Sequence, residues 1–434
     1  MLKDKIKIIL GELVDILPRQ FIQREPPLNP NLLHGRINKA ITIIGPRRAG
    51  KTWFLYQFMN LLIEQGRSLD DFLYINFEDE RLQPFTVDNF QLILDAWFEL
   101  RGPGKKPLIF FDEIQNIDGW DRFIRRLIDQ GYRVCITGSN SKLLSSEIAT
   151  ALRGRTLTRE IFPFSFKEFL QVKGISPTAD LLYRKERHLL ASHFAQYLYC
   201  GGYPEIVLTD DRHTQINIAQ NYFNTIFYRD LVDRHHINNT ELLRHWMHLL
   251  LTNISSLISY RKAENDFKSR GLQVSASTLS RFAAYLEEAF FGTFLEMHSE
   301  SVRKRQTNPK KFYLVDQGLH NFLAMNFSGN KGRLLENVVF LEFQRRGIPV
   351  RYYKTSTDLE IDFITSMPGK EQLIQVCYDM SRQETAEREK RAILKGMSET
   401  GHNEGLILTN NHKEKFSFHG KQLHLCPVYE WLLM

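Results

Sequence analysis

Long hydrophobic runs are missing from this sequence of 434 residues. No stretch approaches the roughly 18 consecutive apolar residues that a membrane-spanning helix needs, so we expect no insertion into a membrane. Residues 1–21 interleave charged side chains with isoleucine and leucine. This pattern is typical of an amphipathic helix and excludes the continuous apolar core of a signal peptide. Internal repeats and low-complexity tracts are also missing.

Cysteine is scarce and scattered. The four cysteines are Cys135, Cys200, Cys377 and Cys426, and no two lie close enough in sequence for a zinc knuckle or a redox motif. A reducing cytoplasm suits such a set, and we expect the protein there. A strong charge imbalance is absent too, because the net charge is only +7. That excess permits binding to nucleic acid without requiring it.

The chain has the composition of a globular protein, with 43% hydrophobic and 25% charged residues, and its length predicts more than one domain. Short apolar runs alternate with amphipathic helical patterns in the first third. The expected strands are residues 40–44, 72–77, 107–111, 133–137 and 157–162. This alternation predicts an α/β fold with a parallel sheet and helices on both faces, over residues 1–170.

The remaining residues predict three further parts. Residues 171–253 are predominantly helical and are interpreted as a helical lid or linker. In residues 254–330, expected helices at 254–261 and 276–289 precede strands at 294–298 and 311–315, which favours a winged helix-turn-helix. Residues 331–434 begin with a helix at 332–345 and continue with strands at 350–353, 360–364 and 372–378. They predict a small α/β module.

A phosphate-binding loop follows the first expected strand and precedes an expected helix. It satisfies the pattern G-x-x-x-x-G-K-[ST] over Gly45, Pro46, Arg47, Arg48, Ala49, Gly50, Lys51 and Thr52. The glycines let backbone N–H groups face phosphates, Lys51 supplies a charge to the β- and γ-phosphates, and Thr52 offers a hydroxyl to Mg²⁺. We expect these residues and the adjacent Trp53 to bind ATP with Mg²⁺.

Two carboxylates end a buried strand 61 residues after the loop, at Asp112 and Glu113. Parallel strands present their functional residues at their carboxyl ends, so this pair is expected beside the phosphate-binding loop. Asp112 is interpreted as the residue that holds Mg²⁺, usually through water. Glu113 is interpreted as the residue that orients or deprotonates the attacking water.

Residues in two further segments have alternative interpretations. Asn140, preferred to Ser139, follows the strand at 133–137, where it either senses the γ-phosphate or caps a helix. Arg153 and Arg155 either stabilise charge on the transferred phosphoryl group, in their own or a neighbouring subunit, or belong to a surface turn.

These motifs resemble a group of prokaryotic AAA+ ATPases in which a P-loop domain is followed by a winged helix and a C-terminal domain related to restriction endonucleases. The resemblance covers nearly the whole chain. Besides the P-loop, it rests on Phe111-Asp112-Glu113-Ile114-Gln115, Thr137-Gly138-Ser139, Leu152-Arg153-Gly154-Arg155 and Gly201-Gly202-Tyr203-Pro204. It implies Mg-ATP as the ligand, a P-loop strand near the centre of the sheet, and a partner protein or homo-oligomer that completes the site.

The resemblance also implies where a nuclease-like module would hold Mg²⁺. Glu336 lies on the expected helix, Asp362 on a strand, and Gln375 where a further ligand belongs, while Cys377 stands in place of the expected lysine. A thiol cannot replace an ammonium that polarises water or stabilises developing negative charge. We therefore expect a module that keeps the fold and has lost cleavage, with Glu360 as a possible compensating acid.

A cluster of basic residues marks a candidate DNA-binding surface. It consists of Arg303, Lys304, Arg305, Lys310 and Lys311, interrupted by the turn-forming sequence at 306–309. In a winged helix these residues would line the wing and contact a phosphate backbone, while Ser277, Thr278, Ser280 and Arg281 would face a groove. The alternatives are a solvated loop and a surface for protein contacts.

Three functions remain open from the sequence. The first is an ATPase that passes a conformational change to a partner protein or to DNA. The second is an ATP-dependent nuclease that uses Glu336 and Asp362, against which the missing lysine argues. The third is a nucleotide-binding adaptor with negligible hydrolysis, which the presence of Glu113 disfavours.

Overall fold

The computed structural model describes residues 2–18, 20–33, 35, 38–138, 152–176, 181, 187–324, 331–366, 371–418 and 420–434. The chain divides into two compact units, Met1–Phe162 and Pro163–Met434. The division falls a few residues before the end of the expected P-loop domain at residue 170. Among the described residues, no helix combines the length and the apolar character needed to cross a membrane.

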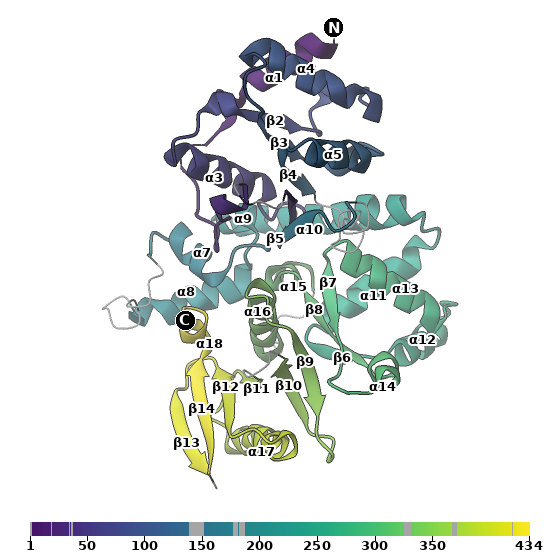
Figure 1. Ribbon diagram of the computed structural model, residues 1–434. Helices are drawn as coiled ribbons and strands as arrows, with labels where there is room; N and C mark the ends of the chain where they lie inside the picture. The colour runs from purple at the N-terminus through teal and green to yellow at the C-terminus, as the bar shows by residue number, and fades with distance from the viewer. Residues whose placement is uncertain are drawn as a thin grey trace. The chain divides into compact units, whose positions relative to one another are not determined.

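Five parallel strands form the sheet of the first unit, in the order β2-β3-β4-β1-β5 (Figure 1). They are β1 (Ala40–Ile44), β2 (Phe72–Asn76), β3 (Leu108–Asp112), β4 (Arg133–Gly138) and β5 (Thr156–Glu160). Strands β1 and β3 are buried along their whole length, as expected for strands covered on both faces. The predicted α/β class with a parallel sheet is confirmed.

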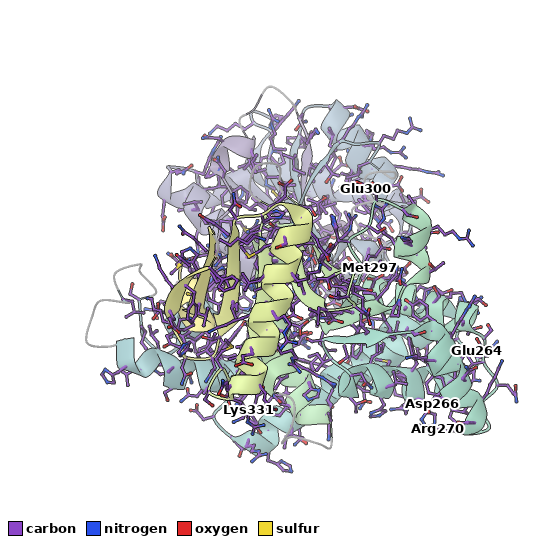
Figure 2. All side chains as sticks on the ribbon, turned by 90° about the horizontal axis from the view of Figure 1, so that it is seen from below. Glu264, Asp266, Arg270, Met297, Glu300 and Lys331 are labelled. Atoms are coloured by element: carbon purple, nitrogen blue, oxygen red, sulfur yellow. The ribbon has the colours of Figure 1, made fainter. Side chains whose placement is uncertain are left out.

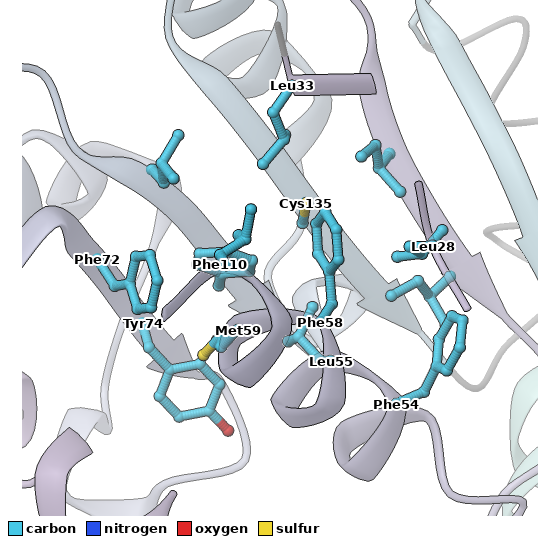
Figure 3. Close-up of a cluster of buried hydrophobic side chains, with 14 of the residues drawn as sticks. Leu28, Leu33, Phe54, Leu55, Phe58, Met59, Phe72, Tyr74, Phe110 and Cys135 are labelled. Carbon is cyan, nitrogen blue, oxygen red and sulfur yellow. The ribbon is translucent and has the colours of Figure 1, made fainter. Parts of the chain in front are cut away.

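Helices cover both faces of this sheet. Helix α3 (Lys51–Glu64) packs on one face, in a core that includes Phe58, Phe110 and Cys135 (Figure 3). Because successive strand residues point to opposite faces, Phe111 points away from α3. Its ring instead contacts Phe90 of α4 (Phe90–Arg101) and Phe123 of α5 (Trp120–Asp129). The first unit also contains α1 (Leu2–Gly11) and α2 (Leu13–Ile16).

The second unit begins with helices, as the sequence predicts. They are α7 (Phe166–Val172), α8 (Arg187–Cys200), α9 (Pro204–Val207), α10 (Arg212–Thr225), a π-helical segment at Ile226–Asp233 and α11 (Thr240–Thr252). Ser165 and Asp211 cap α7 and α10 by accepting backbone N–H groups.

A three-stranded antiparallel sheet follows, in the order β6-β8-β7. Its strands are β6 (Ser256–Ile258), β7 (Gly292–Leu295) and β8 (Lys310–Leu314), and the accompanying helices are α12 (Tyr260–Ser269), α13 (Ala276–Glu288) and α14 (Val302–Thr307). The expected helix at 254–261 is wrong, because residues 256–258 pair with β8. The expected turn at 306–309 is wrong in part, since the side chain of Ser301 caps α14, which continues to Thr307.

The C-terminal part contains a mixed six-stranded sheet in the order β13-β14-β12-β11-β10-β9. The strands are β9 (Val350–Lys354), β10 (Glu360–Thr365), β11 (Leu373–Cys377), β12 (Glu404–Thr409), β13 (Glu414–Phe418) and β14 (Lys421–Pro427). The helices are α15 (Gln317–Leu323), α16 (Lys331–Arg345), α17 (Gln383–Thr400) and α18 (Val428–Trp431). Helix α17 lies across this sheet (Figure 2) and contributes Ile393 and Met397 to its core. The small α/β module is therefore present.

Candidate nucleotide-binding site

The phosphate-binding loop connects β1 to α3. Gly45 and Gly50 both have positive φ, +145° and +93°, and Gly50 is the N-cap residue of α3. A β-carbon on Gly45 would lie 2.1 Å from the carbonyl oxygen of Ile161, so the backbone leaves no space for a side chain. The loop therefore turns where the sequence expects it and leads directly into the amino end of a helix, which is an anion-binding position.

Lys51 is buried in this loop, with an exposed fraction of 4%. Its ammonium lies 3.0 Å from the carbonyl oxygen of Pro46 and 3.7 Å from Oε1 of Glu113. Burial lowers the pKa of Lys51, while the carboxylates of Glu113 and Asp112 oppose that change. The structure thus brings Lys51 and Glu113 together, and the lysine faces negative charge.

Asp112 and Thr52 form the oxygen-rich side of the site. The hydroxyl of Thr52 donates to Oδ2 of Asp112 over 2.7 Å, Tyr74 donates to the same oxygen over 3.2 Å, and Thr137 donates to Oδ1. Burial, with Glu113 as the next contribution, raises the pKa of Asp112 to about 6. A hydroxyl and a carboxylate side by side fit Mg²⁺, which takes few protein ligands and keeps water and phosphate oxygens.

Glu113 follows β3 in a left-handed backbone conformation, with φ of +52°. Its N–H donates to Oγ1 of Thr137 over 3.0 Å, and the side-chain amide of Gln115 donates to Oε2. Thr137 therefore fixes the backbone of Glu113, and Gln115 fixes the direction of its carboxylate. Thr137 and Gln115 belong to motifs that the sequence singled out, but the motifs did not predict a role for either residue. Their signal was their position at the carboxyl ends of strands β4 and β3.

Arg24 is a site residue that the sequence gave no reason to select. Its buried guanidinium donates to the carbonyl oxygen of Ala49 over 2.5 Å and also to that of Phe162. Its backbone N–H donates to the side chain of Gln57 on α3 over 2.8 Å, and the Gln57 amide returns a bond to the Arg24 carbonyl. Arg24 thus joins the P-loop, α3 and the segment after β5.

The remaining loop residues are less enclosed. Arg47 lies 3.7 Å from the Glu78 carboxylate, and Arg48 has a positive φ of 62°. Trp53 is half exposed, and its ring lies edge-on to Tyr56. Asn140 and Ser139 lie outside the described residues.

Arg153 and Arg155 lie at the opposite end of the sheet from the P-loop. The Ala40 N–H donates to the Arg155 carbonyl oxygen at the start of β1, whereas Gly45 follows the end of that strand. The length of β1 separates the two ends by about 13 Å, beyond the reach of an arginine side chain. The guanidinium of Arg155 pairs with Asp129. The interpretation of these arginines as acting on their own subunit's phosphates is therefore wrong.

The basic cluster of the second unit does not form one surface. Lys311 is buried, with an exposed fraction of 1%, and contacts carboxylates that include Glu336 and Asp362. Burial disfavours its charge, but these carboxylates outweigh burial and raise the pKa of Lys311. Its expected role in binding DNA is therefore wrong. Lys310 pairs with Glu296 over 3.1 Å. The exposed members, Arg303 and Lys304, lie on α14.

Three family models match this chain. Residues 37–170 match a family model described as an AAA domain, and residues 191–330 and 331–431 match two models described as domains of unknown function, DUF8612 and DUF4143. An uncharacterized protein of Methanocaldococcus jannaschii is 38% identical over 405 residues, which are 91% of this chain and 88% of that protein. An uncharacterized protein of Haemophilus influenzae is 29% identical over 398 residues, 90% and 93% of the two chains.

Similarity to solved structures is weaker. A Walker-type ATPase of Pyrococcus abyssi is 12% identical, with a TM-score of 0.42, over 74% of this chain and 95% of that one.

Proposed function

We propose that this chain, which belongs to the family of the Methanocaldococcus jannaschii protein and contains an AAA domain, binds ATP with Mg²⁺ and hydrolyses it. One observation carries the proposal. Lys51 and Thr52 at the start of α3 lie against Glu113 and Asp112 at the end of β3, at distances of 3.7 and 2.7 Å. These are the charges and oxygen donors that phosphoryl transfer requires, placed at one edge of the sheet.

The side chains then have distinct tasks. Mg²⁺ would be held by Thr52 and Asp112 and would neutralise charge on the phosphates. The backbone N–H groups of the loop bind phosphate oxygens, and Lys51 turns from Glu113 to the β- and γ-phosphates. Glu113, released from the ammonium and still held by Gln115, orients the water that attacks the γ-phosphorus and accepts its proton. The products are ADP and phosphate.

In this proposal, the second unit passes the effect of ATP hydrolysis to a partner. We assign residues 171–253 to a helical lid and residues 254–330 to a winged helix, with α12, α13 and the β6-β8-β7 sheet as its elements. ATP binding and hydrolysis change the conformation of these parts, which act on a partner protein or on DNA. Arg303, Lys304 and Arg305 on α14 are the basic residues available for a phosphate backbone. The C-terminal module, restriction-endonuclease-like in this proposal, has no cleavage activity.

In this proposal, two arginines that the sequence singled out act between subunits. Arg153 and Arg155 serve the phosphates of a neighbouring copy in a homo-oligomer, because their position excludes their own site. Asn140 keeps the proposed sensing role.

Steady-state hydrolysis of ATP tests the proposal. Lys51→Ala and Glu113→Gln are each expected to lower kcat at least about a hundredfold, because each removes a group that acts on the transition state. Lys105→Ala is the matched control, since that side chain is 81% exposed and is 3.9 Å from its nearest carboxylate, Asp71. Full turnover in Lys51→Ala would overturn the assignment.

The contact between Lys51 and Glu113 also favours a second candidate, an adaptor that binds ATP with negligible hydrolysis. In this alternative the ammonium keeps the carboxylate away from water. Wild-type turnover would then be slow and unchanged in Glu113→Gln, while ATP binding would still require Lys51. The same set of variants distinguishes the two functions.

A further inference from the structure

Three carboxylates of the second unit converge on one ammonium. Nζ of Lys311, on β8, lies 2.9 Å from Oε1 of Glu336 on α16. It also lies 2.7 Å from Oε1 of Glu360 and 2.7 Å from Oδ1 of Asp362, both on β10. Lys311, Glu336 and Asp362 are each more than nine-tenths buried. Three elements that are separate in sequence thus meet at a single positive charge.

The carboxylates are held in place by further hydrogen bonds. Oδ2 of Asp362 accepts the Val376 N–H over 2.9 Å, and the Tyr313 hydroxyl donates to Oε1 of Glu336 over 2.6 Å. Gln375 accepts the Asp362 N–H over 3.3 Å and donates to Glu389 over 2.7 Å. Because the second oxygen of Asp362 is already bound, its first oxygen is directed at the ammonium. The geometry is therefore fixed by the strands and not by a flexible surface contact.

A divalent metal does not fit this arrangement. Oxygen ligands bind Mg²⁺ at about 2.1 Å, so a metal shared by these carboxylates would lie at the point that the ammonium occupies. Within the described ranges, no group of three or more His, Cys, Asp or Glu side chains is arranged to hold a metal ion. The sequence expected Mg²⁺ at Glu336 and Asp362 and found no lysine at residue 377. A different lysine, Lys311 of β8, lies among these carboxylates at the place of the expected metal.

We propose that Lys311 is the permanent cation of this cluster, in the place where the same carboxylates would otherwise bind a divalent metal. The ammonium neutralises buried negative charge and joins β8 to α16 and β10. It acts together with the backbone pairing of Met297, which follows β7, to Tyr352 of β9. The three-stranded sheet is therefore fixed to the C-terminal sheet without a metal, and the C-terminal module cannot use metal-dependent cleavage.

Removal of the ammonium tests whether Lys311 takes the place of a divalent metal. In a chelator, Lys311→Met is expected to lower the melting temperature of the full chain by roughly 10 °C, because it leaves buried carboxylates without a counter-charge. Millimolar Mn²⁺ should recover much of the lost melting temperature. Lys311→Met should then bind one more Mn²⁺ ion per chain than wild type does. Lys310→Met is the control, since Lys310 pairs instead with Glu296. Mn²⁺ should leave wild type and the control unchanged. If Mn²⁺ fails to restore Lys311→Met, the proposal is wrong.

A second measurement uses only the native wild-type chain, in case the variant does not fold. Amine-reactive labelling read by mass spectrometry should modify the exposed Lys304 and leave Lys311 unmodified, with and without Mn²⁺. Labelling of Lys311 at a rate similar to that of Lys304, or only when Mn²⁺ is added, would show that the ammonium is not a permanent part of the cluster. Mn²⁺-dependent cleavage of DNA by wild type that is lost in Asp362→Asn would also overturn the proposal.

Discussion

Gly45 has no space for a side chain, because a β-carbon there would lie 2.1 Å from the Ile161 carbonyl oxygen at a φ of +145°. Gly45→Ala is therefore expected to lower the free energy of unfolding by more than about 2 kcal/mol and to weaken ATP binding. Gly104→Ala is the control, since no atom lies within 4 Å of its added β-carbon. Urea unfolding measures the free energy of unfolding of both variants. Equal stabilities would mean that the loop relaxes without cost.

Arg24 connects three backbone segments around the loop, although it lies outside the residues that match the AAA domain model. Arg24→Met leaves the carbonyl oxygens of Ala49 and Phe162 without this donor. We expect ATP to bind about tenfold more weakly and the free energy of unfolding to fall by about 2 kcal/mol. Arg101→Met, which removes only a surface pair with Asp70, should change neither quantity. Isothermal titration with Mg-ATP measures the difference.

At the scale of elements, Asp316 joins the loop after α8 to the start of α15. Its carboxylate accepts the Gly202 N–H over 2.6 Å and the Gly318 N–H over 2.8 Å, and a β-carbon on Gly201 would lie 1.9 Å from it. Gly201 is thus explained by the close approach of a buried carboxyl group, and Gly202 by the carbonyl oxygen of Phe164, which would lie 2.2 Å from an added β-carbon.

The same carboxyl group predicts a pH dependence of stability. Burial raises the pKa of Asp316 from its ordinary value of 3.8 to about 7. Between these values the folded chain binds the proton and the unfolded chain does not, so this group's contribution to stability falls as pH rises from 4 to 7. The difference in unfolding free energy between wild type and Asp316→Asn should change by roughly 3 kcal/mol between pH 4.5 and pH 8. Urea unfolding at both values measures it, and an unchanged difference would contradict the shift.

The sequence predicted the helices and strands more accurately than it predicted the contacts between side chains. Every expected strand of the first sheet is present. Strands β1 and β3 carry their own signal because they are apolar and buried along their whole length, whereas β5 is only partly buried. Strand β6 was taken for a helix because its three residues are too few for periodicity to distinguish. Arg24 and Lys311 were missed or misassigned for a different reason. Their partners lie far away in sequence, and a charged residue carries no local mark of burial.

At the scale of the whole molecule, Arg153 and Arg155 predict assembly. The double variant Arg153→Ala/Arg155→Ala and the variant Glu113→Gln are each expected to be inactive alone. Mixed, they should recover turnover, because the arginines of one copy complete the intact Glu113 site of the other. Steady-state hydrolysis by the mixture checks this. If the double variant alone retains wild-type turnover, these arginines belong only to a surface turn.

The central claim is that Lys51 and its neighbours bind Mg-ATP, and equilibrium titration of the full chain with Mg-ATP tests it most directly. Wild type should bind one nucleotide per chain, and Lys51→Ala should weaken that binding at least about a hundredfold, since the proposed role of the buried ammonium is to contact the phosphates. Lys105→Ala should bind as wild type does. Equal affinities of wild type and Lys51→Ala, or no binding by wild type, would contradict the account.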